Sequence, residues 1–421
     1  MSEITDHARQ ERQEILKRII RDLHAGVPVK HLQKTFAALI KDVSPEEIAD
    51  MENALIQEGL PVEEVQRLCE VHAEVFDKSL KKVGKPAKMP GHPLYTFVEE
   101  NKFAKMILKN LKRSLKSLVK GRPKPEEARK FGDEFARLKE IEKHYQRKEN
   151  QLFPVLEKQG FVGPTKVMWG KHDEIRAHLK KADELLRAGD WPALAGQFKT
   201  LSGTVKKMMF LEEKILYPTS ARKLKDSDWA KIKLGEPAIG YAWVKPSNLW
   251  DARLAEAVSE AGKTAAAEVP KSSAPSAVPE KGGEDNAVIP LSTGRLSAEQ
   301  IDLMLKTLPF DVTYVDENDR VAYYSEGRER IFPRSPAIIG REVQNCHPPK
   351  SLHVVNEIVR AFKDKSKDVA EFWIRKDGLF IHIRYFPVYD GEGRYRGVLE
   401  VTQELSGQRA LEGERRLLDW S

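Results

Sequence analysis

Two stretches of the sequence end in nearly the same way and carry residue types that bind metal ions. HYQRKENQLFP occupies residues 144–154, and MMFLEEKILYP occupies residues 208–218. Each has an acidic residue, then one or two polar residues, an apolar part, an aromatic residue and a proline, but only the first has a histidine. A buried carboxylate is unstable unless it is paired, hydrogen-bonded or bound to a metal. We therefore interpret the two stretches as facing halves of one site.

Candidate metal ligands occur in every one of four long amphipathic stretches, near 92–119, 125–157, 164–187 and 190–217. Imidazole and carboxylate groups that converge from four helices are how helix bundles hold iron or manganese. The alternative is that the histidines are ordinary core or surface residues and that each glutamate, near the end of its helix, is solvated. The candidates are His92, His144, Glu149, His172 and Glu213.

Four motifs in this region resemble the hemerythrin-like, or HHE cation-binding, family. They are GHPLYTF at 91–97, HYQRKENQLFP, MWGKHDEIR at 168–176 and FLEEKILYP at 210–218. The resemblance implies a four-helix up-and-down bundle with iron at a mononuclear or dinuclear centre. Its ligands would be the five candidates above, with Glu212 as the alternative to Glu213. Glu213 is preferred because it matches Glu149 in the internal repeat.

Several positions depart from the family pattern. Aligning the endings LFP and LYP places Met208 where the histidine of the fourth helix is expected, and Arg176 stands where dioxygen-binding members have a second histidine. Lys148, one helical turn after His144, has no lone pair for a metal while it is protonated. We expect Met208 to lie beside the metal and to line the site with apolar surface. Such a site is poor in imidazole, which argues against reversible dioxygen carriage.

The segment after Leu291 changes to an apolar period of two, which predicts strands. PFDVTYVDENDRVAYYS and IIGREVQNCHPPKSLHVVNEIV resemble the PAS sensor family. That resemblance implies a pocket for haem, flavin or another small ligand, or a dimerisation surface. Cys346 and His347 lie near the expected pocket, and a thiolate or imidazole is an axial ligand for haem iron. The alternative is that NCHPPK is a turn leading into a helix, with its prolines fixing the backbone.

Composition and period together predict a multi-domain fold, in which an all-α part is followed by an α+β part. The first segment, with LHAGVPVK, KDVSPEEIADME and QEGLPVEEVQRLCEVHAEVF, resembles a helical domain of unknown function. Ala, Ser, Pro, Lys and Glu dominate the predicted linker, which has too little apolar surface to order itself. The expected order is the helical domain at 1–82, the four-helix metal-binding bundle at 84–225, a short extended tail at 226–250, the flexible linker at 251–290, the PAS domain at 291–408 and the start of a C-terminal helix at 409–421.

Charge and cysteine usage exclude several classes of protein. The 71 basic and 64 acidic residues give a net charge of +7, but the two signs are interspersed and no basic block with aromatics occurs, so we expect no nucleic-acid partner. No apolar run approaches the length of a membrane span, and the N-terminus is too polar for a secretory signal. Cys69 and Cys346 show no paired spacing. We expect a cytoplasmic protein without a disulfide framework.

These expectations describe a sensor. Oxidation of the metal, or binding of dioxygen or nitric oxide, would shift helix packing in the bundle, and the PAS domain would read that shift. The expected partners are a small gaseous or redox ligand, a second copy bound through the PAS domain and an unidentified downstream protein. Two hypotheses stay open beside it: a di-iron enzyme acting on peroxide or nitric oxide or in iron handling, and an interaction scaffold with a structural metal. The appended PAS domain favours sensing over catalysis.

Overall fold

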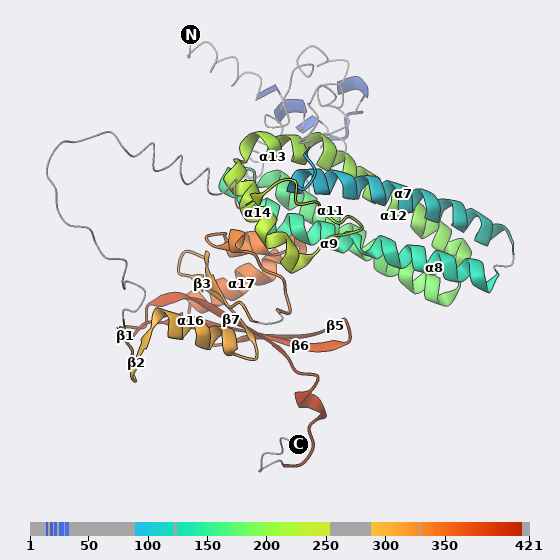
Figure 1. The fold of residues 1–421 in the computed structure, drawn as a ribbon. Coiled ribbons are helices and arrows are strands. Elements are labelled where there is room, and N and C mark those ends of the chain that lie inside the picture. Colours follow the sequence, from blue (N-terminus) through green and yellow to red (C-terminus); the bar gives the residue numbers. More distant parts are fainter. Residues whose placement is uncertain are drawn as a thin grey trace, which may run out of the picture. The chain divides into compact units, whose positions relative to one another are not determined.

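The computed structural model describes residues 89–121, 124–252, 288–327 and 330–414, with scattered residues between 14 and 32. Apart from those scattered residues, the expected helical domain at 1–82 lies outside the described residues, as do most of the linker and the last residues of the C-terminal segment. The described residues form two compact units, one all-helical and one built around a β-sheet (Figure 1). This confirms the predicted fold class.

Four helical rods form a bundle in the first unit (Figure 1). The first and third rods are single helices, α7 (Pro93–Lys120) and α11 (Gly163–Ala188). The second and fourth rods each contain one turn of π-helix, and their parts are α8 (Pro125–Lys139), α9 (Ile141–Arg147), η1 (Lys148–Leu152) and α10 (Phe153–Lys158), then α12 (Trp191–Leu211), η2 (Glu212–Leu216) and α13 (Tyr217–Lys223). These bounds follow the four amphipathic stretches of the sequence closely.

Local sequence signals define where the rods begin and end. Each rod has a proline in its first turn, where the missing N–H would have no helical partner: Pro93, Pro125, Pro164 and Pro192. Gly189, at φ 68°, ends α11 in the left-handed conformation, and the Asp190 side chain then accepts the N–H of Ala193 to begin α12. Such short connections make successive rods antiparallel.

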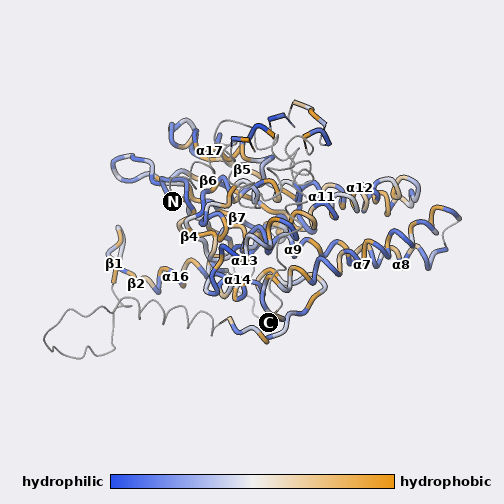
Figure 2. The backbone as a smooth tube through the Cα atoms, turned by 90° about the horizontal axis from the view of Figure 1, so that it is seen from above, coloured by the Kyte–Doolittle hydropathy of each residue, from blue (hydrophilic) through white to orange (hydrophobic). Residues whose placement is uncertain are grey.

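The core of the bundle follows the apolar period of the helices. On α7 the buried residues recur every three or four positions, with Ile107, Leu108, Leu111, Leu115 and Leu118 on one face. The bands of hydrophobic and hydrophilic residues along α7, α8, α11 and α12 are visible in Figure 2. α7 packs against α8 and α12, and α11 packs against α12. Burial of these faces holds the four rods together.

Residues 226–239 are helical, which corrects the expected extended tail. α14 (Asp226–Ile239) begins with a capping box in which the Asp228 carboxylate accepts the N–H of Lys225. It buries Trp229 and Ile232 against the bundle and contains Pro237 near its end. The segment was expected to be extended, but burial of one face outweighs the cost of a proline in the last turn.

The second unit is an antiparallel sheet with the strand order β4-β3-β7-β6-β5. The helix α17 (Leu352–Lys363) packs against β6 and β7. A small core forms from Val315, Val321, Ile338, Phe362 and Val398. The strands are β3 (Asp311–Asp316), β4 (Val321–Tyr324), β5 (Ala370–Lys376), β6 (Leu379–Tyr389) and β7 (Tyr395–Glu404). The predicted hairpin, helix and three-strand meander are all present.

Three segments of this unit differ from expectation. β1 (Val288–Pro290), in the expected linker, pairs with β2 (Arg295–Ser297). α16 (Ala298–Thr307) was not predicted, although Ser297 and Gln300 form a capping box at its start. At the C-terminus, only Gln408–Ala410 form a short 3-10 helix, and the described residues after it are not helical. The β1–β2 pair and α16 were not predicted because short elements give weak periodicity.

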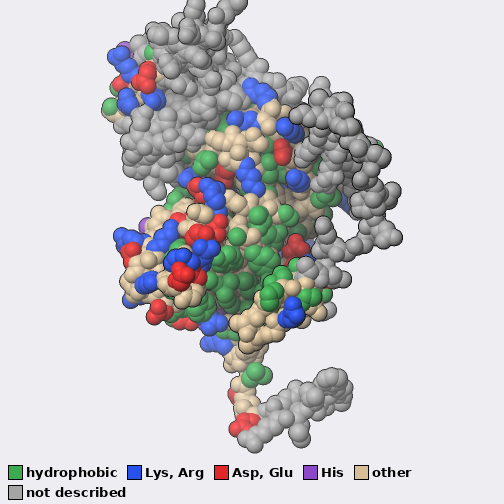
Figure 3. Space-filling view, turned by 90° about the vertical axis from the view of Figure 1, so that its left-hand side faces the viewer, with side chains coloured by type: hydrophobic (Ala, Val, Ile, Leu, Met, Phe, Trp, Pro, Cys, Tyr) green, Lys and Arg blue, Asp and Glu red, His purple; other side chains and the backbone are tan. Residues whose placement is uncertain are grey.

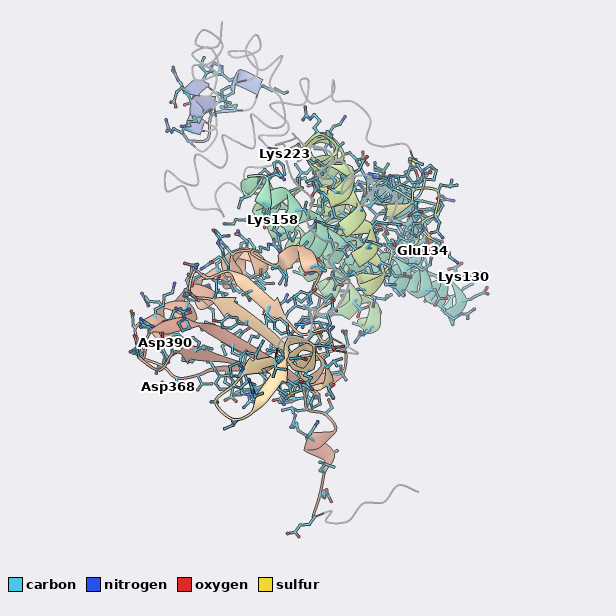
Figure 4. All side chains as sticks on the ribbon, turned by 60° about the vertical axis from the view of Figure 1, so that its left-hand side comes forward. Lys130, Glu134, Lys158, Lys223, Asp368 and Asp390 are labelled. Carbon is cyan, nitrogen blue, oxygen red and sulfur yellow. The ribbon has the colours of Figure 1, made fainter. Side chains whose placement is uncertain are left out.

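Charged side chains of both signs are interspersed on the face that Figure 3 shows. No helix among the described residues is long and apolar enough to cross a membrane. In Figure 4, Lys130 and Glu134 lie at one end of the bundle and Lys158 and Lys223 at the other, all on its outside. These surface charges contrast with a second set of charged residues that lies inside the bundle.

A substitution at Gly397 can test the register between β3 and β7. It lies in β7 at φ 140°, where it pairs with Asp316 of β3, and a Cβ there would overlap the carbonyl oxygen of Val315. We expect Gly397→Ala to destabilise the PAS unit by about 3 kcal/mol, because strain and overlap add. Gly391→Ala is the matched control, since a Cβ at that turn position meets nothing. Equal denaturant midpoints for the two variants would contradict the register.

Candidate functional site

The bundle buries an unusual set of charged residues near the π-helical turns. Glu100, Arg147, Lys148, Glu212 and Glu236 are each 0% exposed. His144, Glu149 and His172 are also buried. Ionised groups lose several kcal/mol when they leave water, so each must be paired inside the protein. The network of pairs defines the candidate site.

The π-helical turns have a cause in the repeated motif. Pro154 has no N–H to donate to the carbonyl of Asn150, four residues earlier, and its ring would clash with that carbonyl. The chain widens, and Phe153 donates instead to Lys148, five residues earlier. Pro218 follows η2 in the same way, and Tyr217 donates to Glu212. Each proline therefore adds one residue to the turn that carries the acidic position of its motif.

The widened turn brings a run of neighbours on the second rod to the interior. His144 and Arg147 lie just before it, and Lys148 and Glu149 lie within it; all four are buried. An ordinary α-helix would turn about 100° per residue and direct some of these side chains to solvent. π-turns inside α-helices often occur at functional sites. The second rod thus supplies two cations, one carboxylate and one imidazole.

His172 of α11 lies between a carboxylate and an ammonium group. Its Nδ1 is 2.7 Å from Glu149 Oε1, and its Nε2 is 2.8 Å from Lys148 Nζ. Burial, together with the Lys148 charge, holds the pKa of His172 well below its ordinary value of 6.5. The neutral ring therefore donates from Nδ1 and accepts at Nε2. Tyr145 stacks on it at 4.2 Å between ring centroids.

Glu212 of η2 receives three partners. The Lys148 ammonium is hydrogen-bonded to its Oε1, and His144 Nε2 lies 3.2 Å from the same oxygen. Asn101 Nδ2 donates to Oε2 at 2.7 Å. Although burial raises the pKa of Glu212, the Lys148 ammonium and His144 hold it below its ordinary value. Glu212 is therefore ionised inside the bundle.

His144 bridges two carboxylates. Its Nδ1 is 2.7 Å from Glu100 Oε2 on α7, and its Nε2 faces Glu212. Both ring nitrogens of His144 therefore face carboxylate oxygens. Glu100 is further held by the Arg147 guanidinium and by the N–H of Ala242 at 2.9 Å. The chain after α14 therefore takes part in closing the site.

Two arginines complete the network. Arg147 pairs with Glu100 and, at 2.9 Å, with Glu236 of α14, and its guanidinium lies 4.7 Å from the Phe97 ring centroid. Arg176 of α11 bonds both oxygens of Glu149 at 2.9 Å and also pairs with Glu142. Planar guanidinium groups suit such two-point bonding to carboxylates. Arg176 therefore holds Glu149 against His172.

The structure separates His92 from the other predicted ligands. His92 is the N-cap of α7, and its Nδ1 accepts the N–H of Leu94 at 3.1 Å. Its ring packs against Trp229 and Trp250, and burial lowers its pKa to about 4. Two helical turns, about 12 Å, separate it from Glu100 along α7. His92 therefore caps and packs a helix end instead of joining the network.

On the fourth rod, Glu212 enters the network and Glu213 does not. Glu213 is partly exposed and pairs with Lys105 on α7. The sequence comparison preferred Glu213 because it assumed that the two motifs superimpose residue for residue. The structure favours the alternative, Glu212. Met208, one turn earlier, is fully buried in the apolar core.

Sequence reasoning missed Glu100, Asn101 and Glu236 altogether. Glu100 and Asn101 lie in EENKF on α7, where nothing distinguishes them from neighbouring surface residues. The available signal was their position on the apolar stripe, three and four residues after Phe97, where polar side chains are unexpected. Glu236 lies in the segment that was expected to be extended. Lys148 and Arg176 were recognised as departures from the family pattern, but not as partners of the candidate ligands.

The residues at the centre do not fit a bound metal ion in this arrangement. The Nε2 of His172 accepts from Lys148, and both ring nitrogens of His144 face carboxylate oxygens. Glu212 and Glu149 are both bonded to cationic side chains. Among the described residues, no group of three or more His, Cys, Asp or Glu side chains is arranged to hold a metal ion. The side chains that meet at the centre are therefore bonded to one another and to Lys148 and Arg176.

The two candidate ligands in the sheet unit, Cys346 and His347, have different surroundings. His347 lines a cavity of about 150 Å³ inside the sheet unit, and its Nδ1 donates to the carbonyl of Val343 at 2.8 Å. Burial lowers the pKa of His347, so the ring is neutral and its acceptor is Nε2. Cys346 is not among the residues that line the cavity, and its Sγ contacts the carbonyl of Glu342 at 3.5 Å. Only His347 is therefore placed to meet a ligand.

Comparisons with known families match three segments of the chain. A family of unknown function, DUF438, matches residues 16–82, the hemerythrin HHE cation-binding domain matches 92–220, and a PAS domain matches 301–406. The order is the one expected from the sequence. As a general class, the hemerythrin and PAS matches support a metal-binding sensor. No curated protein matches the chain.

Three of the solved structures that are similar to this chain each cover about a quarter to a third of it. A C-terminal domain from Streptococcus mutans is 31% identical, covers 31% of this chain and 100% of its own, and has a TM-score of 0.30. The PAS domain of a protein from Colwellia psychrerythraea is 19% identical over 26% of this chain and 97% of its own, with a TM-score of 0.22. A sensory box sensor histidine kinase from Vibrio cholerae is 10% identical over 25% and 90%, with a TM-score of 0.20.

The neutral state of His172 predicts how stability depends on pH. Its pKa in the folded chain is well below the ordinary 6.5, so below pH 6.5 the unfolded chain binds a proton that the folded chain does not. The free energy of unfolding should fall as the pH drops below 6.5, by up to about 1.4 kcal/mol per pH unit for this one group. Glu212, whose pKa is lowered from 4.5, adds a further loss at still lower pH.

Urea unfolding followed by far-ultraviolet circular dichroism, from pH 7.5 down to pH 5, measures this slope. His172→Gln should have a shallower slope than the wild type, because the amide keeps both hydrogen bonds but does not titrate. His178→Gln, on the same helix but partly exposed, should keep the wild-type slope. Identical slopes in the wild type and His172→Gln would contradict the assignment.

Proposed function

We propose that this chain, which carries a DUF438 segment, a hemerythrin HHE domain and a PAS domain in that order, is a sensor that recognises a small molecule in its PAS domain. The observation that carries the proposal is a partly open apolar cavity of about 150 Å³ between α17 and the sheet. An apolar cavity of this size takes a molecule such as benzene. A cavity left in a packed core costs stability, so an occupant would stabilise the unit.

The lining of the cavity defines the class of ligand. Its walls are mostly aliphatic, with Val355 and Ile358 from α17, and Phe372 comes from β5. Four lining residues are polar, and two of them, the neutral imidazole of His347 with its acceptor at Nε2 and the carboxylate of Glu400 on β7, accept hydrogen bonds. The other two, Ser351 and Tyr385, have hydroxyl groups that can donate or accept. The ligand that fits is small and largely apolar, with one end that donates a hydrogen bond.

The same volume bears on the cofactors expected for a PAS domain. Haem and flavin have several times more atoms than benzene and exceed a cavity of about 150 Å³. Cys346, the other proposed haem ligand, does not line the cavity. We therefore propose a small organic ligand in place of a prosthetic group.

The expected stimuli at the bundle were redox state, dioxygen and nitric oxide, and each of them requires iron there. Because the candidate ligands are bonded to Lys148, Arg176 and one another, we place recognition of the stimulus in the PAS domain. The hypotheses of a di-iron enzyme and of a structural metal depend on the same ligands. Neither gains separate support from the described residues.

Small aromatic probes test the cavity. We expect phenol and aniline, which donate a hydrogen bond, to raise the melting temperature of the full chain more than benzene does. A probe at 100 times its dissociation constant should raise the free energy of unfolding by about 2.7 kcal/mol. Val355→Phe should abolish the response by filling the cavity, whereas Val369→Phe, at an exposed position, should keep it. An equal response from the wild type and Val355→Phe would rule out this cavity as the ligand site.

We further propose that the PAS domain joins two copies of the chain. β5 is an edge strand of the sheet, and Trp373 on it is 64% exposed, with Ile374 and Leu379 also exposed. An exposed edge with large apolar side chains is a surface that another strand can cover. We propose that β5 of a second copy of the chain covers this edge, because this pairing requires no other protein.

Light scattering coupled to size-exclusion chromatography tests this surface. The wild-type chain should have the mass of a dimer, and Trp373→Glu should shift it to the monomer, because the new carboxylate would be buried without a partner. Leu411→Glu makes the same type of change at another exposed apolar residue and should leave the dimer intact. A wild-type monomer, or a dimer that survives Trp373→Glu, would refute this arrangement.

A further inference from the structure

We infer that the ammonium group of Lys148 is a built-in cation that takes the place of a metal ion at the centre of the bundle, so that this hemerythrin-like domain closes without metal. The inference concerns the bundle alone and does not depend on the ligand proposed for the PAS domain. It concerns a chain that matches a cation-binding family and whose central side chains are bonded to Lys148, Arg176 and one another.

The position of the Lys148 ammonium carries the argument. The side chain is completely buried, and its Nζ is hydrogen-bonded to Glu212 Oε1 and lies 2.8 Å from His172 Nε2. An imidazole nitrogen and a carboxylate oxygen, supplied by two different rods, are the donors that a divalent transition metal would use. Here both donors bind one ammonium.

The surroundings of Nζ suit a cation of this kind. The ring centroid of Tyr145 lies 4.6 Å from Nζ, and an aromatic face attracts positive charge. Lys148 is also one helical turn after His144, whose own Nε2 lies 3.2 Å from Glu212 Oε1. The two imidazoles therefore approach one region from two rods, and the lysine reaches it from the second rod.

The carboxylates around this centre are paired within the protein. The cationic side chains of Arg147, Lys148 and Arg176 contact the carboxylates of Glu100, Glu142, Glu149, Glu212 and Glu236. Lys148 is the cationic side chain paired with Glu212, and a buried carboxylate that loses its partner is strongly unfavourable.

A single substitution should exchange the two kinds of cation. K148E removes the ammonium and supplies a carboxylate one turn after His144, next to His172 and Glu212. Two imidazoles and two carboxylates would then meet without an internal cation, and this set suits iron, cobalt or zinc. K148M removes the ammonium and supplies no ligand. K180E makes the same change of charge as K148E at an exposed position on α11.

The experiment uses the full chain without an affinity tag, stripped with a chelator and titrated with cobalt(II). We expect the wild type and K180E to show no visible cobalt bands from the bundle and no change in melting temperature. K148E should melt lower than the wild type without metal, bind cobalt with visible bands and melt higher once cobalt is bound. K148M should melt lower than the wild type, because Glu212 loses its cationic partner.

Wild-type chain that binds cobalt with visible bands, and loses them in H172Q, would overturn the inference. Cobalt that also binds to H172Q is bound away from the centre, and this result agrees with the inference. A K148M variant as stable as the wild type would show that the ammonium is not needed, and would also overturn it. If K148E does not fold, the wild-type titration and the K148M melt still decide the question.

Discussion

The bundle depends on one constraint, which is that an ionised group removed from water must meet an opposite charge or a set of hydrogen bonds. The salt bridge between Lys148 and Glu212 meets this constraint at the centre, and the other buried pairs surround it. Glu212 joins the second rod to the fourth, and His144 joins that pair to Glu100 on α7. All four rods and α14 contribute to the same network, since His172 comes from α11 and Glu236 from α14. Loss of any member would leave its partner buried and unpaired.

The two π-turns explain why charged groups can enter the core at all. Pro154 and Pro218 each prevent the normal helical hydrogen bond four residues back, and the chain responds by adding one residue to the turn. The extra residue brings Lys148 and Glu149 inward on one rod and Glu212 inward on the other. The repeated motif, which resembles two halves of a metal site, therefore also places ionised side chains inside the helix bundle.

The interiors of the two units differ in polarity. The bundle is filled with paired charges around His172 and leaves each candidate ligand bonded within the protein. The PAS unit has an apolar cavity with two hydrogen-bond acceptors, His347 and Glu400, at its wall. Recognition of a small molecule fits the second interior, because an apolar cavity gains stability when it is filled, whereas a closed network of charges gains nothing from a further ion.

The sequence alone determined the class and order of the parts, because helical period, proline and glycine signals and the motifs are local. It predicted the four rods, the strands β3 to β7 and the inward positions of His144 and His172. It did not predict α14 as a helix, because burial of Trp229 outweighed a proline signal, and it preferred Glu213 because the repeats were aligned without knowing which face each turn presents. Only the tertiary structure decided that Lys148 lies against His172 and Glu212. Residues 24 and 64 positions apart meet through packing of separate helices, and no local pattern records such a contact.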